Sequence, residues 1–570
     1  MLYLEKCITG GAPRLVQFGA PFFCSLVVAL IFALILTPFY FLFGVLHYNP
    51  LLSITDISTN VIFSLGVISI TGSPVIALAL LLLLYVVGWV KFFIIRRNLV
   101  VDDLFDLSEF FQVSTLTTIA EIILFFVFFI TIVWLVNRRA IQLRRSLLWL
   151  FFPLSLVVAA TTCPEAVFES IKGKHIENFN RGADFLWGGQ LYSVAYDFIE
   201  KRVIQKEVTN YKNSPFKNRV SFADAKIKKN IHIILLESFT SPIRLGVVEP
   251  GNRALSYQGL GRLTYAVAPV FGGNSAGSEY EILCGNIESY GFGGLTFNSF
   301  GRGKGSSCLP NLLKESGYDS IATTGTKKHF FNADRAYFSM GFDHFFSYED
   351  HPKQDLDGIR ISDREMFATN RVNLVQRMRE TGKPILNYLA TIAGHGPYYL
   401  NDVLRPIKIG HGVAGVQQYL NRIWYTSQEL NEHLGQLKEI DPDSIVFIVG
   451  DHLVGEAVAA MSSKVSRNDI LDKRLQDYVL LDNFKQVDAG HIAHNEVSAV
   501  IRNILSGSGA VALAKDRPIA TNMGYFDRES LAPIKCDGGG LPGSLCSVVE
   551  SDKAYHRELG LNIIKASLAH

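Results

Sequence analysis

IHIILLESF over residues 231–239 and IVFIVGDH over residues 445–452 are the two segments in which an apolar run meets polar, chemically reactive residues. Short apolar runs without alternation are typical of strands buried on both faces of a parallel sheet. Between them, over residues 416–437, apolar residues recur at helical spacing. Strands alternating with helices predict an α/β sandwich whose active site lies at the carboxyl ends of the strands.

Both runs end in side chains that bind hard metal ions. Glu237 follows the first run, and Asp451 and His452 follow the second. Two carboxylates and an imidazole at one sheet edge suit a single divalent cation, and Mn²⁺ or Zn²⁺ fits this mixed donor set better than Ca²⁺. Each acidic residue alone could instead cap a following helix. The two motifs together favour the metal site.

A segment of small residues, GGNSAGSEYEIL over residues 272–283, precedes an apolar-periodic stretch. It predicts a helix with Ser275 or Ser278 at its N-terminus, where anions are favoured. A hydroxyl there, deprotonated by a bound metal, can attack phosphorus. The structural alternative is a serine N-cap with a glutamate three or four residues later.

Composition divides the chain into parts. The 570 residues are 49% hydrophobic and 19% charged, with a mean hydropathy of +0.22, which is too apolar for an ordinary soluble protein. Only 16 Asp, Glu, Lys and Arg residues lie in residues 1–163. We predict a membrane region over 1–163, a juxtamembrane connector of short helices over 164–228, a catalytic domain over 229–515 and a C-terminal extension over 516–570. A net charge of +2 excludes the basic footprint of a nucleic-acid binder.

The membrane region is expected to cross the bilayer five times, because each apolar run approaches the length of about 20 residues that a crossing needs. The predicted crossings lie at residues 18–46, 57–71, 74–95, 122–136 and 146–162. Basic residues before the first crossing and between the last two set the orientation. Everything after Cys163 is then outside the cytoplasm, with Arg96 and Arg97 as a local exception to the positive-inside rule. A cleaved signal peptide is the alternative reading of the first run.

Cysteine usage points to the same compartment. Cys536 and Cys546 flank a glycine-rich loop, and Cys284 and Cys308 bring the number in the soluble part to four. An even number, with one pair only ten residues apart, is typical of disulfides in an oxidising compartment. Reduced, buried thiols are the alternative.

The motifs occur in a familiar order. The chain resembles lipoteichoic acid synthases and periplasmic phosphoglycerol transferases, which belong to the sulfatase and alkaline-phosphatase-like superfamily. The resemblance covers roughly residues 229–505, and the five-span layout is similar to that of lipoteichoic acid synthases. It rests on the strand ending in Glu237, GGNSAGSEYEILCG at 272–285, FNADRAY at 331–337 before MGFD at 340–343, GHGP at 394–397 and GDHL at 450–453.

The resemblance implies a set of metal ligands and a nucleophile. Glu237, Asp451 and His452 become ligands of one divalent metal, with Mn²⁺ favoured and Zn²⁺ as the alternative. Ser275 becomes the nucleophile and fourth ligand, at a position where the family usually has Thr. Two later histidines resemble the superfamily's His-x-Asp segment and are interpreted as packing and helix-capping residues: His491 and His494.

The resemblance also implies residues around the substrate. His395 is expected in the substrate pocket, binding the headgroup phosphate or protonating the leaving oxygen. Arg360 and Arg335 are carried over as substrate-binding residues, although the Trp-containing segment that lipoteichoic acid synthases carry near Arg360 is absent here. Cys284 and Cys308 match positions at which periplasmic phosphoglycerol transferases show cysteines, which implies that they pair.

These features predict a membrane-anchored phosphotransferase of the bacterial inner membrane, with its catalytic domain on the periplasmic side. It would move phosphoglycerol from phosphatidylglycerol to an envelope glycan through a covalent intermediate on Ser275. Phosphoethanolamine transfer from phosphatidylethanolamine is the close alternative. A phosphatase or sulfatase is a second alternative, although the Cys/Ser-x-Pro-x-Arg context of usual sulfatases is missing around Ser275. A non-catalytic scaffold or channel is disfavoured, because charges near the predicted spans are too few for an ion path.

Overall fold

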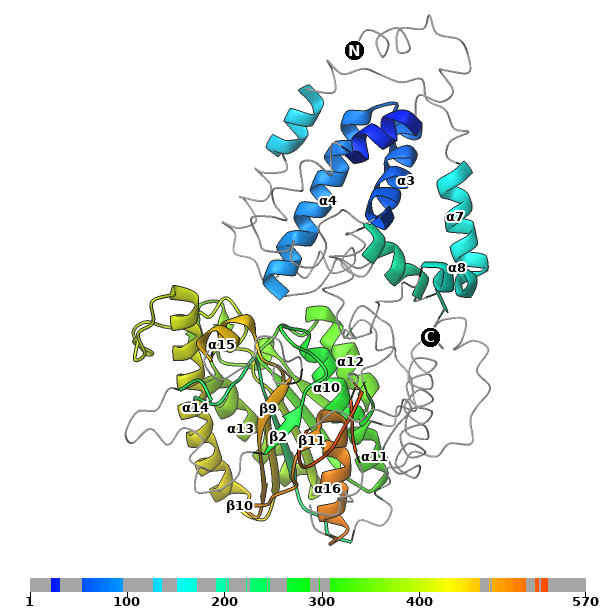
Figure 1. Ribbon diagram of the computed structural model, residues 1–570. Helices are drawn as coiled ribbons and strands as arrows, with labels where there is room; N and C mark the ends of the chain where they lie inside the picture. The colour runs from blue at the N-terminus through cyan, green and yellow to red at the C-terminus, as the bar shows by residue number, and fades with distance from the viewer. Residues whose placement is uncertain are drawn as a thin grey trace, which may run out of the picture. The chain divides into compact units, whose positions relative to one another are not determined.

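The computed structural model describes residues 22–30, 54–95, 127–135, 151–171, 191–200, 202–203, 222, 226–242, 244–246, 264–287, 297, 308–461, 471, 474–508, 518–521 and 524–531 (Figure 1). The chain forms two compact units, one of residues 1–207 with 291–293 and one of residues 208–290 with 294–570.

The first unit is helical where it is described. Its helices are α3 (Ile54–Thr71), α4 (Pro74–Ile95), α7 (Phe151–Thr162) and α8 (Pro164–Ile171). The predicted break between the second and third apolar segments is confirmed, since α3 ends at Thr71 and Gly72 takes a φ of 74°. The Ser73 amide donates to Thr71 Oγ1 at 3.1 Å, which holds the turn before Pro74 begins the next helix.

The predicted membrane crossings over residues 18–46, 122–136 and 146–162 lie partly outside the described residues. The helical pieces described within them cover residues 22–30, 127–135 and 151–162. Within the described part of the chain, no helix has both the length and the apolar character that crossing a membrane requires.

The second unit is built on a mixed sheet that has nine strands within the described residues, in the order β11-β2-β9-β8-β1-β7-β3-β4, with β10 paired to β9. The strands are β1 (Ile231–Leu236), β2 (Tyr265–Val267), β3 (Asp319–Thr324), β4 (His344–Phe346), β7 (Ile385–Ala390), β8 (Ile445–Gly450), β9 (Leu475–Asp482), β10 (Lys485–Gln486) and β11 (Ile492–Ala493).

The two apolar runs lie side by side in the centre of this sheet. Strand β1 pairs in parallel with β8 on one side and β7 on the other, and every residue of all three strands is buried. The prediction of buried parallel strands is therefore confirmed for the centre of the sheet. The sheet as a whole is mixed, because β9 runs antiparallel to both β8 and β2.

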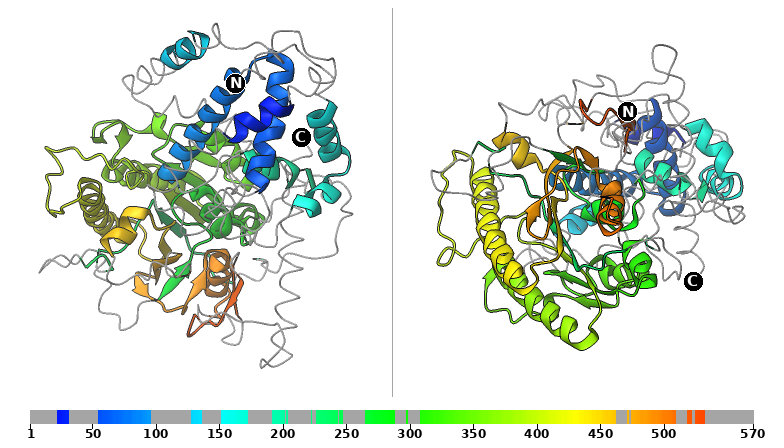
Figure 2. Two further views of the ribbon diagram at one scale, coloured as in Figure 1. Left: turned by 45° about the horizontal axis from the view of Figure 1, so that its top comes forward. Right: turned by 90° about the horizontal axis from the view of Figure 1, so that it is seen from below.

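Helices cover both faces of the sheet, as Figures 1 and 2 show. One core contains Ile231, Ile233 and Leu235 of β1, and the other contains Ile234 and Leu236. Because side chains alternate along a strand, β1 contributes to both layers, as an α/β sandwich requires. The helices are α10 (Ser275–Cys284), α11 (Leu309–Glu315), α12 (Ala333–Met340) and α16 (Val497–Leu505) on the first face, and α13 (Asp363–Thr381), α14 (Ala414–Ile440) and α15 (Gly455–Ala460) on the second.

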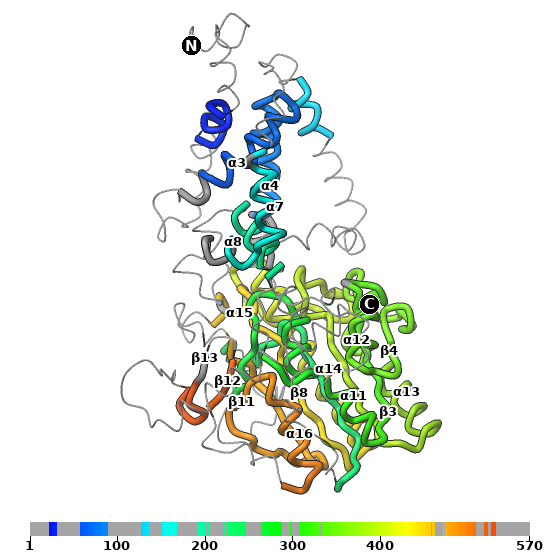
Figure 3. Tube along the Cα trace, turned by 90° about the vertical axis from the view of Figure 1, so that its right-hand side faces the viewer, coloured from blue at the N-terminus to red at the C-terminus, as the bar shows by residue number. Residues whose placement is uncertain are grey.

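Short elements complete the unit. A two-stranded hairpin, β5 (Leu356–Asp357) with β6 (Arg360–Ile361), precedes α13. A second hairpin, β12 (Ile519–Thr521) with β13 (Gly524–Phe526), packs on residues of β2, β9 and β11 and lies beside β11 in Figure 3. Single 3-10 turns occur at η6 (Phe330–Asn332), η7 (Tyr348–Asp350) and η8 (His494–Glu496).

The cysteine predictions have two outcomes. Cys284, the last residue of α10, is joined to Cys308, just before α11, by a disulfide with an S–S distance of 2.02 Å. The pairing that the family resemblance implied is thus present. The predicted bond between Cys536 and Cys546 lies outside the described residues.

Candidate metal centre and nucleophile

The carboxyl ends of β1 and β8 place three donor side chains together. Leu236 and Gly450 are partners in the parallel register, so the residues that follow them emerge at the same edge of the sheet. One ligand atom from each of Glu237, Asp451 and His452 lies within 4.8 Å of the others, and all three residues are buried. The structure brings together the three residues that the sequence predicted as metal ligands.

Backbone geometry fixes the orientation of Asp451. Its Oδ1 accepts hydrogen bonds from the amides of Ser238 and His452, both at 2.6 Å. Gly450 permits this close packing, since a Cβ there would lie 2.7 Å from the Phe239 carbonyl oxygen. Asp451 Oδ2 is buried, has no hydrogen bond within the described residues, and lies 3.3 Å from His452 Nε2.

The charges of this cluster are poorly stabilised by the protein alone. Burial raises the pKa of Glu237, and the nearby Asp451 carboxylate raises it further. Burial likewise raises the pKa of Asp451 to about 6. A divalent cation would neutralise both carboxylates and use the unpaired Oδ2 of Asp451, so the donor set fits a metal with mixed oxygen and nitrogen ligands.

The structure separates the two candidate serines. Ser275 is the first residue of α10 and follows three residues with positive φ, Gly272 at 80°, Gly273 at 147° and Asn274 at 72°. Its Oγ donates to Glu237 Oε2 at 2.9 Å, which places it at the predicted metal ligands. Ser278 is fully buried and its Oγ donates to the Asp451 carbonyl oxygen at 2.7 Å. Of the two hydroxyls, that of Ser275 is therefore the one directed at the predicted metal ligands.

His395 lies in the loop after β7, beside Glu237. Gly394 makes this approach possible, because a Cβ there would lie 2.0 Å from the Glu237 carbonyl oxygen. His395 Nδ1 is 2.6 Å from the Gly396 carbonyl oxygen, so Nδ1 carries the proton in that contact and Nε2 is left for a substrate. The surrounding protein lowers the pKa of the His395 imidazole, and the Glu237 charge opposes that shift; the residue as a whole is exposed by its accessible surface.

Arg360 has a different environment from the one expected. Its guanidinium donates to the carbonyl oxygens of His395, of Gly396 at 2.8 Å and of Pro397 at 2.9 Å. It also stacks over the Tyr399 ring at 5.7 Å. These three hydrogen bonds to successive carbonyl oxygens hold the backbone of the His395 loop in place. The sequence analysis predicted a substrate contact for Arg360 and did not anticipate this role.

The remaining predicted residue, Arg335, is exposed on α12, and no interaction with the described site residues joins it. The same helix instead reaches the site through Tyr337, whose hydroxyl donates to Glu279 Oε2 of α10 at 2.7 Å. Sequence reasoning missed this pair. The sequence feature that could have indicated this pair is Glu279, which lies one turn after Ser275 in a helix whose residues after Ser275 are all buried.

The two later histidines differ. His491 Nδ1 accepts from the Tyr265 amide at 3.0 Å and its ring stacks on the Tyr265 ring at 5.5 Å, which agrees with a packing role. His494 is buried at the start of η8, and neither ring nitrogen has a hydrogen bond within the described residues. Burial, with a contribution from His452, lowers the pKa of His494 to about 3, so the ring is neutral.

With the geometry in place, the family can be assigned. The sulfatase family model matches residues 229–494. These residues are a sulfatase-family domain. The match begins two residues before β1 and ends at His494, and so includes the candidate metal ligands, Ser275 and the His395 loop.

Individual relatives cover parts of the chain. A protein named cyclic beta-1,2-glucan modification protein, from Rhizobium meliloti, is 29% identical over 237 residues, which are 40% of this chain and 36% of that protein. The lipoteichoic acid synthase of Staphylococcus saprophyticus is 27% identical over 176 residues, 30% of this chain and 27% of that enzyme. The matched segments thus span about a third or less of these relatives.

A solved structure with a similar arrangement is the lipoteichoic acid synthase LtaP from Listeria monocytogenes. It aligns with a TM-score of 0.46 and 17% sequence identity, over 63% of this chain and 98% of that one.

Proposed function

We propose that the chain is a membrane-anchored phosphotransferase that moves phosphoglycerol from phosphatidylglycerol to an envelope glycan, acting on the periplasmic face of the bacterial inner membrane. The observation that carries the proposal is the position of Ser275 Oγ, which lies at the start of α10 and 2.9 Å from Glu237, one of the three clustered residues Glu237, Asp451 and His452. The sulfatase-family match supports metal-assisted chemistry on an ester of this kind. The names of the relatives, a lipoteichoic acid synthase and a glucan modification protein, support a headgroup donor and a glycan acceptor.

The first chemical step forms a bond between Ser275 Oγ and phosphorus and breaks the bond between phosphorus and the diacylglycerol oxygen. Glu237, Asp451 and His452 would hold the divalent cation, with Ser275 as the fourth ligand. When bound, that cation lowers the pKa of the serine hydroxyl and offsets the negative charge of the phosphate. The Ser275 hydroxyl proton leaves through its hydrogen bond to Glu237 and is released to solvent, and the leaving diacylglycerol oxygen is protonated by the imidazolium form of His395, which carries a proton on Nε2 as well as on Nδ1.

In the second step an acceptor hydroxyl attacks phosphorus, and the bond to Ser275 Oγ breaks. The now neutral His395 takes up the acceptor proton on Nε2, and Ser275 regains a proton from solvent, so the site returns to its starting state. Throughout, the N-terminal amides of α10 face the phosphate oxygens, a position at which a helix stabilises anions.

The test is an incubation of the detergent-purified full chain with phosphatidylglycerol and, separately, with phosphatidylethanolamine. Diacylglycerol release is measured, and the Ser275 peptide is examined by mass spectrometry. We expect release from phosphatidylglycerol and a peptide heavier by one phosphoglycerol group. Diacylglycerol release from phosphatidylethanolamine alone would mean that this lipid, and not phosphatidylglycerol, is the donor. If a phosphorylated product appears without any adduct on Ser275, the reaction is direct hydrolysis and not transfer through a covalent intermediate.

A further inference from the structure

The loop between β7 and α14 shows an inverted pattern of burial. Arg405 is almost completely buried, whereas its neighbours Val403, Leu404 and Ile407 are exposed, Val403 to 89%. Soluble loops usually place the cation outside and the apolar side chains inside. This loop keeps its charge inside and shows its apolar side chains to the solvent.

Buried ion pairs hold the loop in this conformation. Arg405 contacts Asp355 at 2.7 Å, Asp357 at 3.2 Å and Glu429 at 2.7 Å. The Asn401 amide donates to Asp357 Oδ1 at 2.9 Å. Asp355 and Asp357 belong to the β5–β6 hairpin segment and Glu429 belongs to α14. The ion pairs of Arg405 therefore attach the loop that carries the exposed apolar side chains to two elements of the domain.

The hairpin tip extends the same apolar surface toward the site. A Cβ on Gly358 would lie 2.8 Å from the Tyr399 ring, so the tip and the start of the loop are in contact. Ile359 at the tip and Tyr399 are both exposed. We call the exposed set the apolar rim: Ile359, Tyr399, Val403, Leu404, Ile407 and Val413.

The rim adjoins the catalytic side of the domain. Arg360 follows Ile359, stacks over Tyr399 and holds the His395 loop, so one residue touches both the rim and the site. Helix α14 begins where the loop ends and runs back toward the start of β8, so the loop lies at the carboxyl edge of the sheet. In Figure 1 it projects beside α15, which follows β8 at that same edge.

We propose that the apolar rim contacts a phospholipid surface and places the His395 side of the site against the headgroups; this rests on the function proposed above. Clustered exposed aliphatic side chains indicate a membrane or protein contact. The exposed Lys408 and His411 lie within the same loop, against a single exposed carboxylate at Asp402. Aliphatic side chains with adjoining basic groups suit an anionic lipid interface, where acyl chains take the former and phosphates attract the latter.

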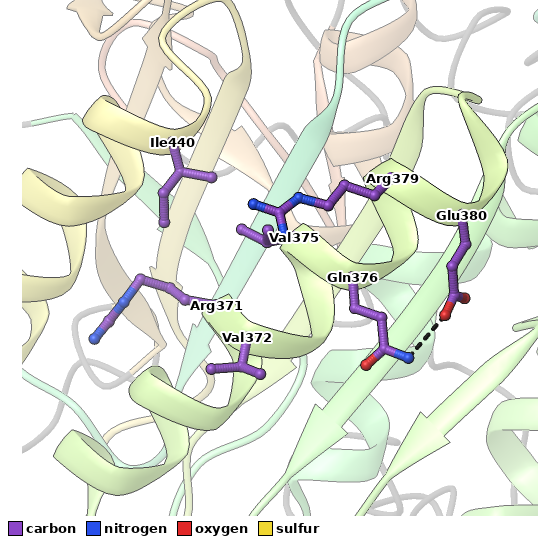
Figure 4. Close-up of a pocket in the computed structure, with 7 residues that line it drawn as sticks. All are labelled: Arg371, Val372, Val375, Gln376, Arg379, Glu380 and Ile440. Carbon is purple, nitrogen blue, oxygen red and sulfur yellow. Dashed lines mark hydrogen bonds between the residues drawn. The ribbon is translucent and has the colours of Figure 1, made fainter.

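A matched control exists on the same domain. Val372 of α13 is 66% exposed and lines a shallow depression with Val375, Arg379 and Ile440, shown in Figure 4. Ile440 ends α14 just before β8 starts, so this depression lies toward the amino ends of the strands. Val372 is therefore the same residue type, similarly exposed, away from the rim.

The direct test uses tryptophan fluorescence. The full chain carrying Val403→Trp is reconstituted into vesicles that contain brominated phosphatidylglycerol, and emission is compared with that of the wild type and of Val372→Trp. We expect quenching of the emission added by Val403→Trp and none for Val372→Trp. If bromine does not quench the emission added by Val403→Trp, the proposal is wrong. The same result is expected if position 403 contacts a glycan or a second copy of the chain in place of the lipid, so that outcome also contradicts the proposal.

The functional test compares Val403→Asp with Val372→Asp. On phosphatidylglycerol vesicles we expect Val403→Asp to lose diacylglycerol release by about tenfold, the order expected when one buried aliphatic contact is lost. On bis(p-nitrophenyl) phosphate, a soluble diester, both variants should match the wild type. If the two variants have equal activity on vesicles, the proposed contact between the apolar rim and the lipid surface is wrong. If the wild type releases no diacylglycerol, the proposed function fails while the quenching result still decides the rim.

Discussion

Ser275 and Ser278 lie one helical turn apart, and the sequence favours Ser275 because it directly follows Gly272–Gly273–Asn274. In the structure Ser278 Oγ donates to the Asp451 carbonyl oxygen, whereas Ser275 Oγ donates to Glu237. The run of positive φ angles before Ser275 is what brings the start of α10 to the carboxylates. The first two of these angles, at Gly272 and Gly273, could be suspected from glycine content, and the third, at Asn274, could not.

Ser275→Ala should lower diacylglycerol release by about a thousandfold or more, because it removes the atom that bonds to phosphorus. Ser275→Thr keeps a hydroxyl and should retain measurable turnover. Ser278→Ala should keep most activity and lose about 1 kcal/mol of stability, the net worth of one buried hydrogen bond. Steady-state rates with phosphatidylglycerol and urea unfolding check these outcomes, and a headgroup adduct on Ser278 would refute the assignment.

Asp451→Asn tests the metal site separately from the fold. The variant should lose most bound metal, measured by elemental analysis after desalting, because one of two carboxylates is gone. Burial raises the pKa of Asp451 to about 6, above its unfolded value, so the charged form destabilises the metal-free fold above that pH. The metal-free variant should therefore be at least as stable as the metal-free wild type at pH 8.

The matched control for this prediction is Asp441→Asn. Asp441 Oδ2 lies 2.8 Å from His232 Nε2, and the pair sits at the opposite edge of the sheet from the cluster. This variant should lose stability and keep its metal. Equal metal content in the two variants would mean that Asp451 is not a ligand.

Arg360→Ala should slow turnover by about ten- to a hundredfold, because three carbonyl bonds that position His395 are lost. Arg360→Lys should rescue little, since an ammonium group cannot reproduce the planar fork. The deciding measurement is a double-mutant cycle with His395→Ala. If Arg360 acts through His395, its removal in the His395→Ala background should cost almost nothing; a full additional loss, mainly in KM, would restore the direct substrate contact.

At the scale of elements, the sequence predicted what local periodicity controls. The buried runs of β1 and β8, the helix over 416–437 and the helix starting near Ser275 all form where expected. The β9–β10 hairpin was missed, because the two strands are joined through Asn483 and Phe484, both with positive φ and without the glycine that marks such turns. The ion pairs of Arg405 were missed because its partners lie 24 to 50 residues away in the sequence.

Helix α10 carries a buried carboxylate whose protonation should appear in stability measurements. Burial raises the pKa of Glu279 to about 8, only partly opposed by the Tyr337 hydrogen bond. Since this pKa lies above the value in the unfolded chain, protonated Glu279 contributes to the free energy of unfolding. That contribution is fully present below about pH 4.5 and is lost as the pH rises through 8. Glu279→Gln should flatten that decline in melting temperature.

Glu432→Gln is the control for this pH series, because Glu432 is exposed on α14. It should leave the slope between pH 4.5 and 8 as in the wild type. If Glu279→Gln declines just as steeply as Glu432→Gln, Glu279 is not the group that titrates.

At the scale of the whole chain, composition predicted an apolar N-terminal part and a polar catalytic part, and the structure separates a helical unit from the α/β unit. The clustering of Glu237, Asp451 and His452 could be predicted because these residues follow the ends of two strands, where a short motif and a simple topology suffice. Arg360 shows the limit of that reasoning. A motif gives the position of a residue in the chain, while its partner, here a row of carbonyls 35 to 37 residues later, depends on the folded loop.

The disulfide links the fold to its compartment and yields the last prediction. Cys284 ends the helix that begins with Ser275, and its bond to Cys308 closes a separation of 24 residues. Alkylation of the denatured chain without reductant should label Cys24 and Cys163 and spare Cys284 and Cys308. Replacing both by alanine should lower the free energy of unfolding by roughly 3 kcal/mol, the loop-entropy value for this length. Such a bond persists only where the compartment is oxidising, so complete labelling of Cys284 and Cys308 in protein from intact cells would argue against a periplasmic catalytic unit.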